Sequence, residues 1–261
     1  MDMTRKATRE VISSHCKQLK LSQRVVSLCE EQATYEQEAF LCQVFQGEVD
    51  QREKSRKARA LSRAMFPTFK TLEGFDTSGI QFPTGLTLDD LAKGTYIQKA
   101  RNLIFYGSVG TGKTHLAIAL GLLACEAGYT VRFYTVTDLV TRLGDAHRQG
   151  RLERVMKEIQ ATDLLILDEW GYIPVDRQGS QLLFRVIADC YERKSLILTT
   201  NLEFSSWGNI FTDEQMAAAM IDRLVHHGYL MIFGGPSYRI TNALMRQNPA
   251  ADWEVTRGQN N

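Results

Sequence analysis

The sequence predicts an α/β fold built on a parallel central sheet, with a small all-helical domain in front of it. Short apolar runs at residues 102–106, 131–136, 164–167 and 195–200 alternate with segments of helical apolar spacing, which is the pattern of βα units. The third run is apolar on both faces, as a strand inside a parallel sheet is. Residues 11–65 lack proline and contain only one glycine, so they predict helices.

The composition limits the class of protein. The chain has 261 residues, 44% of them hydrophobic, which is enough for one α/β domain and a smaller appendage. Because the net charge is only +1, any contact with nucleic acid must come from local basic patches. No apolar run approaches the roughly 20 residues that span a bilayer. Five scattered cysteines without C-x-x-C spacing indicate reduced thiols rather than disulfides or zinc. We therefore expect a cytoplasmic protein.

The helical N-terminal domain is expected over residues 1–66. Its helices should break near Leu21–Ser22 and Thr34, where Ser22 and Thr34 are candidate N-caps. The last helix carries a basic stripe on one face, because its arginines are spaced i, i+4, i+7 and i+11: Arg52, Arg56, Arg59 and Arg63. Such a stripe is typical of binding to a phosphate backbone. A solvated helix face is the alternative.

The second domain is expected over residues 67–247. Phe66–Pro67 should end the preceding helix, because proline disfavours helical geometry in the residue before it. A turn-rich boundary over residues 71–85 leads to one helix over residues 86–99. The polar residues 248–261 predict a disordered tail.

A phosphate-binding loop follows the strand at residues 102–106. The residues match G-x-x-x-x-G-K-[ST] and lie between that strand and an Ala/Leu-rich helix: Gly107, Ser108, Val109, Gly110, Thr111, Gly112, Lys113 and Thr114. The glycines let successive N–H groups face one anion, at the positive end of the helix. Lys113 would neutralise the β- and γ-phosphates of ATP, and the Thr114 hydroxyl would bind Mg²⁺. A glycine-rich turn without function is the alternative.

Polar residues end two later strands. Asp168 and Glu169 follow the apolar run 164–167, at the strand end where ligands of open α/β sheets sit. Asp168 would hold Mg²⁺ through water, and Glu169 would orient or deprotonate the water that attacks the γ-phosphate. Asn201 ends the strand 195–200, where it could contact that water or the phosphate. The alternatives are a helix N-cap for the acids and a plain turn residue for Asn201.

These features together indicate a P-loop NTPase of the additional-strand type, rather than a kinase or a small GTPase. The extra strand 195–200 follows the Asp–Glu strand, and a polar residue ends it. An arginine-rich lid, as in a nucleotide kinase, is not visible. The helix expected over residues 214–224 carries Arg223, which the local sequence alone favours as one half of a surface charge pair with Asp222. His226 and His227 are adjacent, so we expect interface or core residues rather than metal ligands.

Nearly the whole chain resembles one family. The most specific matching segments, besides the loop and strands above, are Phe66–Pro67, Lys70–Asp76, Trp207–Phe211 and Ala219–His227. With these, the chain is similar to the IstB family, the helper ATPases encoded beside the transposase in certain two-gene bacterial insertion sequences. That family is similar to the DnaC helicase loaders and belongs with the initiator-type AAA+ ATPases.

The resemblance implies a role for each matching residue. Lys113 and Thr114 take the Walker A positions, Asp168 and Glu169 take Walker B, and Asn201 takes the first sensor position. Arg223 resembles the arginine finger, in place of the surface charge pair. Arg239 resembles the second-sensor arginine and would bind nucleotide. Residues 137–159 take the place of an extra helix that lies along DNA, whose candidate phosphate contacts are Arg142, Arg148, Arg151, Arg154 and Lys157.

The resemblance also implies a function. The protein would bind ATP and Mg²⁺ between neighbouring copies of itself, form a head-to-tail oligomer on duplex DNA, hydrolyse ATP and recruit or regulate a partner transposase. Two alternatives stay open. One is a DnaC-like replicative helicase loader, and the other is a nucleotide-gated DNA-binding scaffold with negligible turnover.

Overall fold

The computed structural model describes residues 4–172, 175–211 and 213–241. Contacts divide the chain into two compact units, Met1–Arg59 and Ala60–Asn261. This division falls earlier in the chain than the boundary expected after residue 66. The tail expected over residues 248–261 lies outside the described residues.

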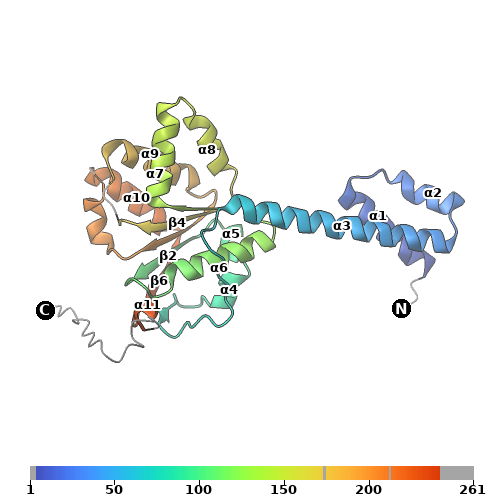
Figure 1. Ribbon diagram of the computed structural model, residues 1–261, viewed down its shortest axis with the longest axis horizontal. Helices are drawn as coiled ribbons and strands as arrows, with labels where there is room; N and C mark the ends of the chain where they lie inside the picture. Colours follow the sequence, from blue (N-terminus) through green and yellow to red (C-terminus); the bar gives the residue numbers. More distant parts are fainter. Residues whose placement is uncertain (1–3, 173–174, 212, 242–261) are drawn as a thin grey trace, which may run out of the picture. The chain divides into compact units, whose positions relative to one another are not determined.

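Three helices form the N-terminal unit and lead out of it: α1 (Arg5–Leu19), α2 (Arg24–Gln32) and α3 (Tyr35–Ala64) (Figure 1). Thr34 caps α3 as expected, since its hydroxyl accepts from the Gln37 N–H while the Gln37 side chain accepts from the Thr34 N–H. The residue before α2 is Gln23 rather than Ser22, although the Ser22 hydroxyl accepts from the Arg24 N–H at 3.2 Å.

A fully buried carboxylate ties the N-terminal unit together. Glu38 of α3 accepts hydrogen bonds from Arg5 and Arg9 of α1, the closest at 3.0 and 2.9 Å. Although burial opposes the charge, these two arginines hold the pKa of the Glu38 carboxyl below its ordinary value. The ion pairs therefore fix α3 against α1 in addition to the small apolar cluster around Ile12, Cys16 and Cys29.

The second unit contains the α/β fold. Its described strands form one six-stranded sheet in the order β1-β6-β2-β5-β4-β3. Only β1 is antiparallel to its neighbour. The strands are β1 (Ile80–Gln81), β2 (Asn102–Gly107), β3 (Val131–Thr135), β4 (Leu164–Trp170), β5 (Ser195–Thr200) and β6 (Gly228–Phe233). The predicted α/β class with a mainly parallel sheet is confirmed, and β5 lies between β2 and β4 as the additional strand.

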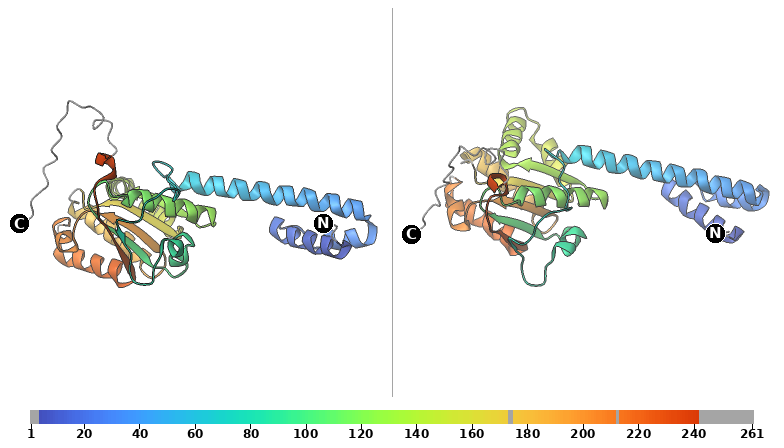
Figure 2. Two further views of the ribbon diagram at one scale, coloured as in Figure 1. Left: turned by 90° about the horizontal axis from the view of Figure 1, so that it is seen from below. Right: turned by 60° about the horizontal axis from the view of Figure 1, so that its bottom comes forward.

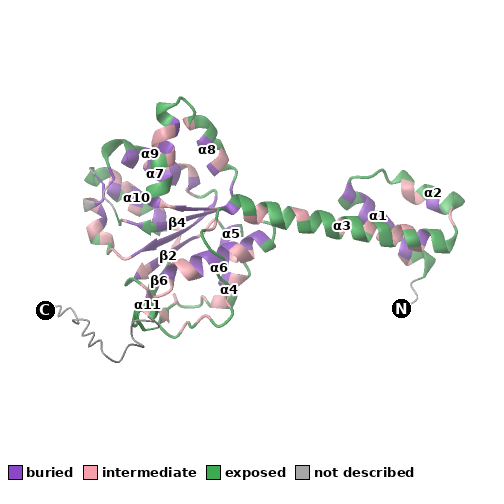
Figure 3. Ribbon diagram, viewed as in Figure 1, coloured by how far each residue is buried: buried purple, intermediate pink, exposed green. Residues whose placement is uncertain are grey.

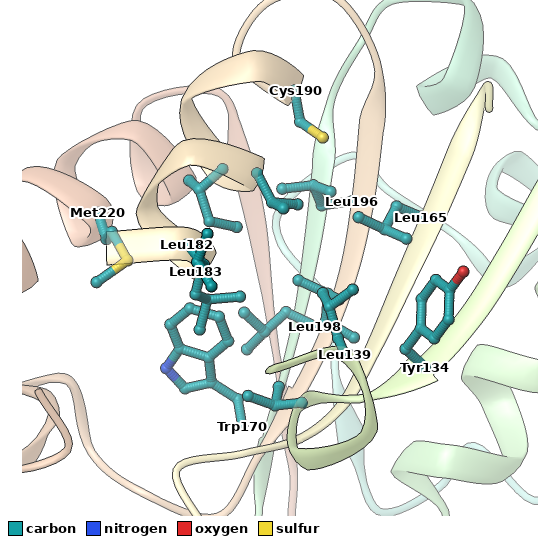
Figure 4. Packing of buried hydrophobic residues seen from close by; sticks show 14 of the residues in the cluster. Tyr134, Leu139, Leu165, Trp170, Leu182, Leu183, Cys190, Leu196, Leu198 and Met220 are labelled. Carbon is teal, nitrogen blue, oxygen red and sulfur yellow. The ribbon is translucent and has the colours of Figure 1, made fainter. Parts of the chain in front are cut away.

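Helices cover both faces of the sheet (Figures 1 and 2). One face packs on α7 (Val136–Arg148), α8 (Leu152–Gln160), α9 (Arg177–Cys190) and α10 (Glu214–His226). The other packs on α4 (Leu88–Ala92), α5 (Thr95–Gln98) and α6 (Lys113–Glu126). Successive strand residues alternate between the two clusters, as Leu165 and Ile166 do. The inner strands β2, β4 and β5 are consequently buried almost throughout (Figure 3), and Figure 4 shows the first cluster around Trp170 and Leu198.

Three local expectations were wrong. The helix expected over residues 86–99 is two short helices, because Gly94 adopts a left-handed conformation between them. After the apolar run 131–136, Thr137 and Asp138 are the expected caps of the next helix, but α7 begins at Val136 and Thr135 caps it. The short strand β1 lies within the segment expected to be only turns. Within the described ranges, none of the helices combines the length and hydropathy needed to cross a bilayer.

Candidate functional site

The phosphate-binding loop connects β2 to α6 at the carboxyl end of the parallel strands. Gly107 and Gly110 both have positive φ, 153° and 84°. A side chain on Gly107 would collide with the carbonyl of Phe233, and one on Gly110 with Ser237. Glycine is therefore required at both positions by conformation and by close packing against the end of β6 and the segment after it.

Lys113 begins α6 and folds back over the loop. Its ammonium donates to the carbonyl oxygens of Gly107 at 2.6 Å and Ser108 at 2.7 Å. The pKa of Lys113 is lowered to about 8, chiefly by burial, while the charge of Asp168 opposes this shift and the charge of Arg239 adds to it. The lysine is thus held close to the loop in an environment that favours an anionic ligand.

Thr114 and Asp168 meet across the sheet edge. The Thr114 hydroxyl lies 2.9 and 3.1 Å from the two carboxylate oxygens of Asp168, and Asp168 is only 4% exposed. Hydroxyl and carboxylate oxygens are ligands that Mg²⁺ prefers. The pair therefore fits the expected magnesium ion, which Asp168 and Thr114 would hold.

Glu169 differs from its neighbours in direction and backbone conformation. It is exposed, whereas Asp168 and Trp170 on either side are buried. Its φ of 61° is left-handed, which is uncommon for a residue with a side chain. The registers of β4 and β5 shift at this point, between Leu167 and Trp170. The carboxylate is thereby turned out of the strand at the edge where the phosphate-binding loop lies.

Asn201 follows β5 at the same edge. Its side chain is partly buried, and its Oδ1 atom is buried without a hydrogen-bond partner among the described residues. Buried amide oxygens are normally paired. An unsatisfied acceptor at this place supports a role for Asn201 toward a bound molecule.

Arg239 lies in α11 (Tyr238–Thr241), which packs on the loop through its first residue. The Tyr238 N–H donates to the Gly110 carbonyl at 3.0 Å. Arg239 is exposed, and its charge contributes to the lowered pKa of Lys113. The predicted second-sensor residue is therefore near the loop, and Ser237 beside it is a neighbour that sequence reasoning missed.

Arg223 is directed elsewhere. It is on α10, where its guanidinium lies over the Phe184 ring at 4.9 Å and donates to the Ala219 carbonyl at 2.9 Å. Its guanidinium forms no ion pair with Asp222 or any other carboxylate of the described part of the chain. The fold does not bring Arg223 to the phosphate-binding loop of its own chain by any contact between described residues.

The candidate DNA-binding arginines of α7 and α8 are largely engaged with other side chains. Arg142 and Arg154 contact Glu158 at 2.8 and 3.5 Å, Arg148 pairs with Asp145, and Arg151 bonds Gln149. Lys157 is exposed. These helices line a pocket of about 900 Å³ that reaches Asp168 and Glu169.

The basic stripe of α3 is freer. Arg52 contacts Glu48 at 2.6 Å and the Leu19 carbonyl at 3.1 Å. Arg56, Arg59 and Arg63 are exposed, and within the described ranges they make no ion pair. Unpaired, exposed arginines on one helix face are available to bind phosphates.

The adjacent histidines come together with Glu192 despite their sequence spacing. The Nε2 atom of His227 lies 2.9 Å from Glu192, and the Arg101 guanidinium contacts its Nδ1. His226 Nδ1 lies 2.7 Å from the Tyr191 hydroxyl. Because an arginine can only donate, Nδ1 of His227 is the acceptor in the contact with Arg101. A neutral His227 then carries its proton on Nε2, which donates to Glu192. With both ring nitrogens engaged, His227 is disfavoured as a metal ligand. This geometry therefore favours the prediction that His226 and His227 are not metal ligands.

The segment of residues 71–75 packs on the start of α6, a contact that the sequence analysis did not predict. The Thr71 carbonyl lies 2.7 Å from Nε2 of His115, and the Phe75 and His115 rings are 4.9 Å apart. A side chain on Gly112 would come within 3.1 Å of Phe75. Residues 70–76 belong to the family resemblance, but no local pattern in them predicts contact with the loop.

Known proteins share this chain's sequence and fold. The model of the family described as IstB-like ATP binding protein matches residues 15–245. The chain is 39% identical to the insertion sequence IS21 ATP-binding protein of Pseudomonas aeruginosa over 236 residues, 88% of each chain. It is 32% identical to the insertion sequence IS5376 ATP-binding protein of Geobacillus stearothermophilus over 249 residues, 94% of this chain and 99% of the other.

Among solved structures, AMPPCP-bound DnaA from Aquifex aeolicus has a TM-score of 0.51 at 24% identity, over 65% of this chain and 51% of DnaA. That likeness shows a shared fold, in agreement with the predicted fold class. Since the family model spans most of the sequence and both relatives align along most of their length, the protein belongs to the family of IstB-like ATP-binding proteins.

Proposed function

We propose that the protein is an ATP-hydrolysing transposition helper, which oligomerises on duplex DNA and recruits or regulates a partner transposase. The observation that carries the proposal is the convergence of Lys113, Thr114, Asp168, Glu169 and Asn201 at one sheet edge. Arg223 instead contacts Phe184. The insertion-sequence names of its relatives support the transposition context.

ATP is the expected ligand of the phosphate-binding loop. The loop amides and the amino end of α6 would bind the phosphates, and Lys113 would exchange its two carbonyl contacts for phosphate oxygens. Mg²⁺, held by Thr114 and Asp168, would neutralise charge that develops on the phosphates. The burial that lowers the pKa of Lys113 also strengthens its attraction to that charge.

Hydrolysis is assigned to Glu169 with help from Asn201. Glu169 is exposed at the sheet edge, so its carboxylate can accept a hydrogen bond from the attacking water or take its proton. Asn201 has a buried amide oxygen without a partner among the described residues, and its side chain would contact the water or the γ-phosphate. Cleavage would remove these contacts, which makes the γ-phosphate a switch.

The position of Arg223 supports assembly of several copies of the protein. Because its guanidinium lies over Phe184 rather than in its own loop, Arg223 would complete the ATP site of a neighbouring copy. Contacts of this head-to-tail kind produce rings or helical filaments. Duplex DNA would bind through phosphate contacts, for which Arg56, Arg59 and Arg63 of α3 are the least encumbered candidates.

The test is ATP turnover with and without duplex DNA, with the Glu169→Gln variant in parallel. We expect DNA to stimulate turnover, and loss of the carboxylate to reduce it at least 100-fold while nucleotide binding persists. Glu203→Gln, an exposed glutamate outside the site, is the matched control and should behave as wild type. If turnover never exceeds background and Glu169→Gln changes nothing, the protein is a nucleotide-gated scaffold.

A pull-down against a transposase and a replicative helicase tests the partner, and capture of the helicase alone would contradict the transposition role.

A further inference from the structure

The strand β5 contributes a threonine to the catalytic edge that the proposed reaction has not used. Thr199 lies on β5 between Leu198 and Thr200 and is 2% exposed. Its hydroxyl accepts a hydrogen bond from the Glu169 N–H at 3.1 Å and donates one to the Asp168 carboxylate. A single hydroxyl thus contacts both carboxylate residues of β4.

These hydrogen bonds lie where the regular backbone pairing of β4 with β5 is interrupted. Leu167 pairs with Leu198 and Trp170 with Thr200, so two residues of β4, Asp168 and Glu169, lie opposite Thr199 alone. This arrangement is a β-bulge, a device that redirects side chains next to active sites. The left-handed φ of Glu169, 61°, is part of it. Because that conformation is unfavourable for a glutamate, neighbouring groups must hold it.

The packing of Trp170, the residue after Glu169, restricts the conformations that the bulge can adopt. Trp170 is fully buried against Trp207 and Phe211, with ring centroids 5.1 and 5.6 Å away. The Thr200 hydroxyl donates to the Trp170 carbonyl at 2.9 Å. Trp170 is therefore fixed, and the freedom that remains at Asp168 and Glu169 is limited by Thr199.

We propose that Thr199 is a positioning residue for ATP hydrolysis, which aims Glu169 outward and holds Asp168 in place through the two hydrogen bonds of its hydroxyl. The inference rests on the proposed ATPase function. Thr199 is also two residues before Asn201, which directly follows β5, so it links the sensor residue to the carboxylates. A shift at Asn201 on loss of the γ-phosphate would thereby reach Glu169 through one strand.

The test compares Thr199→Val, which removes the hydroxyl at nearly constant shape, with Thr199→Ser, which keeps it. Thr162→Val is the matched control, since Thr162 is 6% exposed and its hydroxyl bonds the Ile159 carbonyl away from the site. We expect Thr199→Val to lower kcat about 100-fold, the scale of a misplaced catalytic group, with KM changed less than about threefold. Thr199→Ser should restore most of the rate.

A second readout does not depend on turnover. The Glu169 amide donates to Thr199, so hydrogen exchange at that amide should rise at least about tenfold in Thr199→Val and stay low in Thr199→Ser and Thr162→Val. Melting temperatures identify a variant that fails to fold. If Thr199→Val does not fold, Thr199→Ala replaces it as the variant without a hydroxyl and is compared with Thr199→Ser in the same two measurements. Wild-type turnover with an unaffected Thr199→Val rate and unchanged Glu169 exchange would overturn the inference. A wild type without turnover would instead contradict the proposed ATPase, and the exchange result would still decide whether Thr199 holds the bulge.

Discussion

Glu169 occupies a backbone conformation that its side chain disfavours, at the position where the proposed chemistry needs a carboxylate. Its φ is 61° in a strand otherwise extended. Strained backbone at such places is retained when function requires it. The surrounding contacts from Thr199 and the buried Trp170 supply the compensating stability.

Replacement of Glu169 should therefore separate strain from chemistry. Glu169→Gly and Glu169→Ala both remove the carboxylate, but glycine accepts the left-handed conformation without penalty. We expect the glycine variant to be more stable than the alanine variant by about 1 kcal/mol, measured by denaturant unfolding without nucleotide. At Glu203, where φ is −64°, glycine should give no such advantage. An alanine variant as stable as the glycine variant would show that the bulge relaxes.

The lowered pKa of Lys113 predicts proton uptake on ATP binding. At pH 8.5 the free protein has lysine mostly neutral, because its pKa is about 8. Bound triphosphate favours the charged form and raises this pKa, so affinity should fall as pH rises above about 8. Calorimetry at pH 8.5 in two buffers of different ionisation enthalpy should report proton uptake, and much less at pH 6.5. Lys113→Arg, which stays charged, should abolish the difference, and wild-type binding without uptake would contradict the lowered pKa.

Sequence reasoning identified residues whose chemistry is visible in a short pattern. The loop from Gly107 to Thr114 and the pair Asp168–Glu169 belong to local motifs beside predictable strands. Thr199 could not be identified, because threonine is an ordinary residue in a strand and its role arises from a register shift between two strands. The start of α7 and the break between α4 and α5 were predicted wrongly, since several Thr, Asp and Gly residues lie close to each position.

At the scale of elements, strands were predicted more reliably than helix ends. Runs such as Leu164–Leu167 are buried on both faces, so their composition is unambiguous. The two-residue strand β1 was missed because its pairing with β6 lies far along the chain. The end of α3 belongs to the second unit because Ala60, Leu61 and Ala64 pack in its apolar cluster. No periodicity within α3 marks that change of partner.

The unpaired arginines of α3 predict a salt-dependent interaction with DNA. Combined replacement of Arg56, Arg59 and Arg63 by glutamine should weaken duplex binding and reduce the slope of log affinity against log salt by about 3, since each phosphate contact contributes ~0.9. The charge-matched control replaces Lys17, Lys20 and Arg24, which are exposed on other elements of the N-terminal unit. Titrations at several salt concentrations measure both. Equal slopes for the two triple variants would assign the stripe to solvent or to a protein partner.

The arginines of α7 and α8 behave differently as a set. Glu158 alone contacts two of them, Arg142 and Arg154. These ion pairs must open before the arginines can contact phosphate, and this lowers the net contribution of each arginine to the free energy of DNA binding. If α7 and α8 contact DNA, we expect Lys157 to contribute more readily than Arg142.

At the scale of the whole molecule, the proposed ATP site is divided between two copies of the chain. One copy supplies the loop, the magnesium ligands and Glu169, and the next supplies Arg223. This division is compatible with the fold, because Arg223 lies over Phe184 and, among the described residues, contacts none of its own loop. The fold class could be predicted from the chain alone, whereas a site shared between copies could be anticipated only from family resemblance.

A mixing experiment with two inactive variants tests the shared site most directly. Arg223→Ala subunits retain an intact loop, and Lys113→Ala subunits retain an intact Arg223. In an equal mixture about a quarter of head-to-tail interfaces would join the two intact halves. We predict that DNA-stimulated ATP turnover, absent from either variant alone, returns in the mixture to roughly that fraction of the wild-type rate. Turnover that stays at the sum of the two separate variants at every mixing ratio would contradict the shared site.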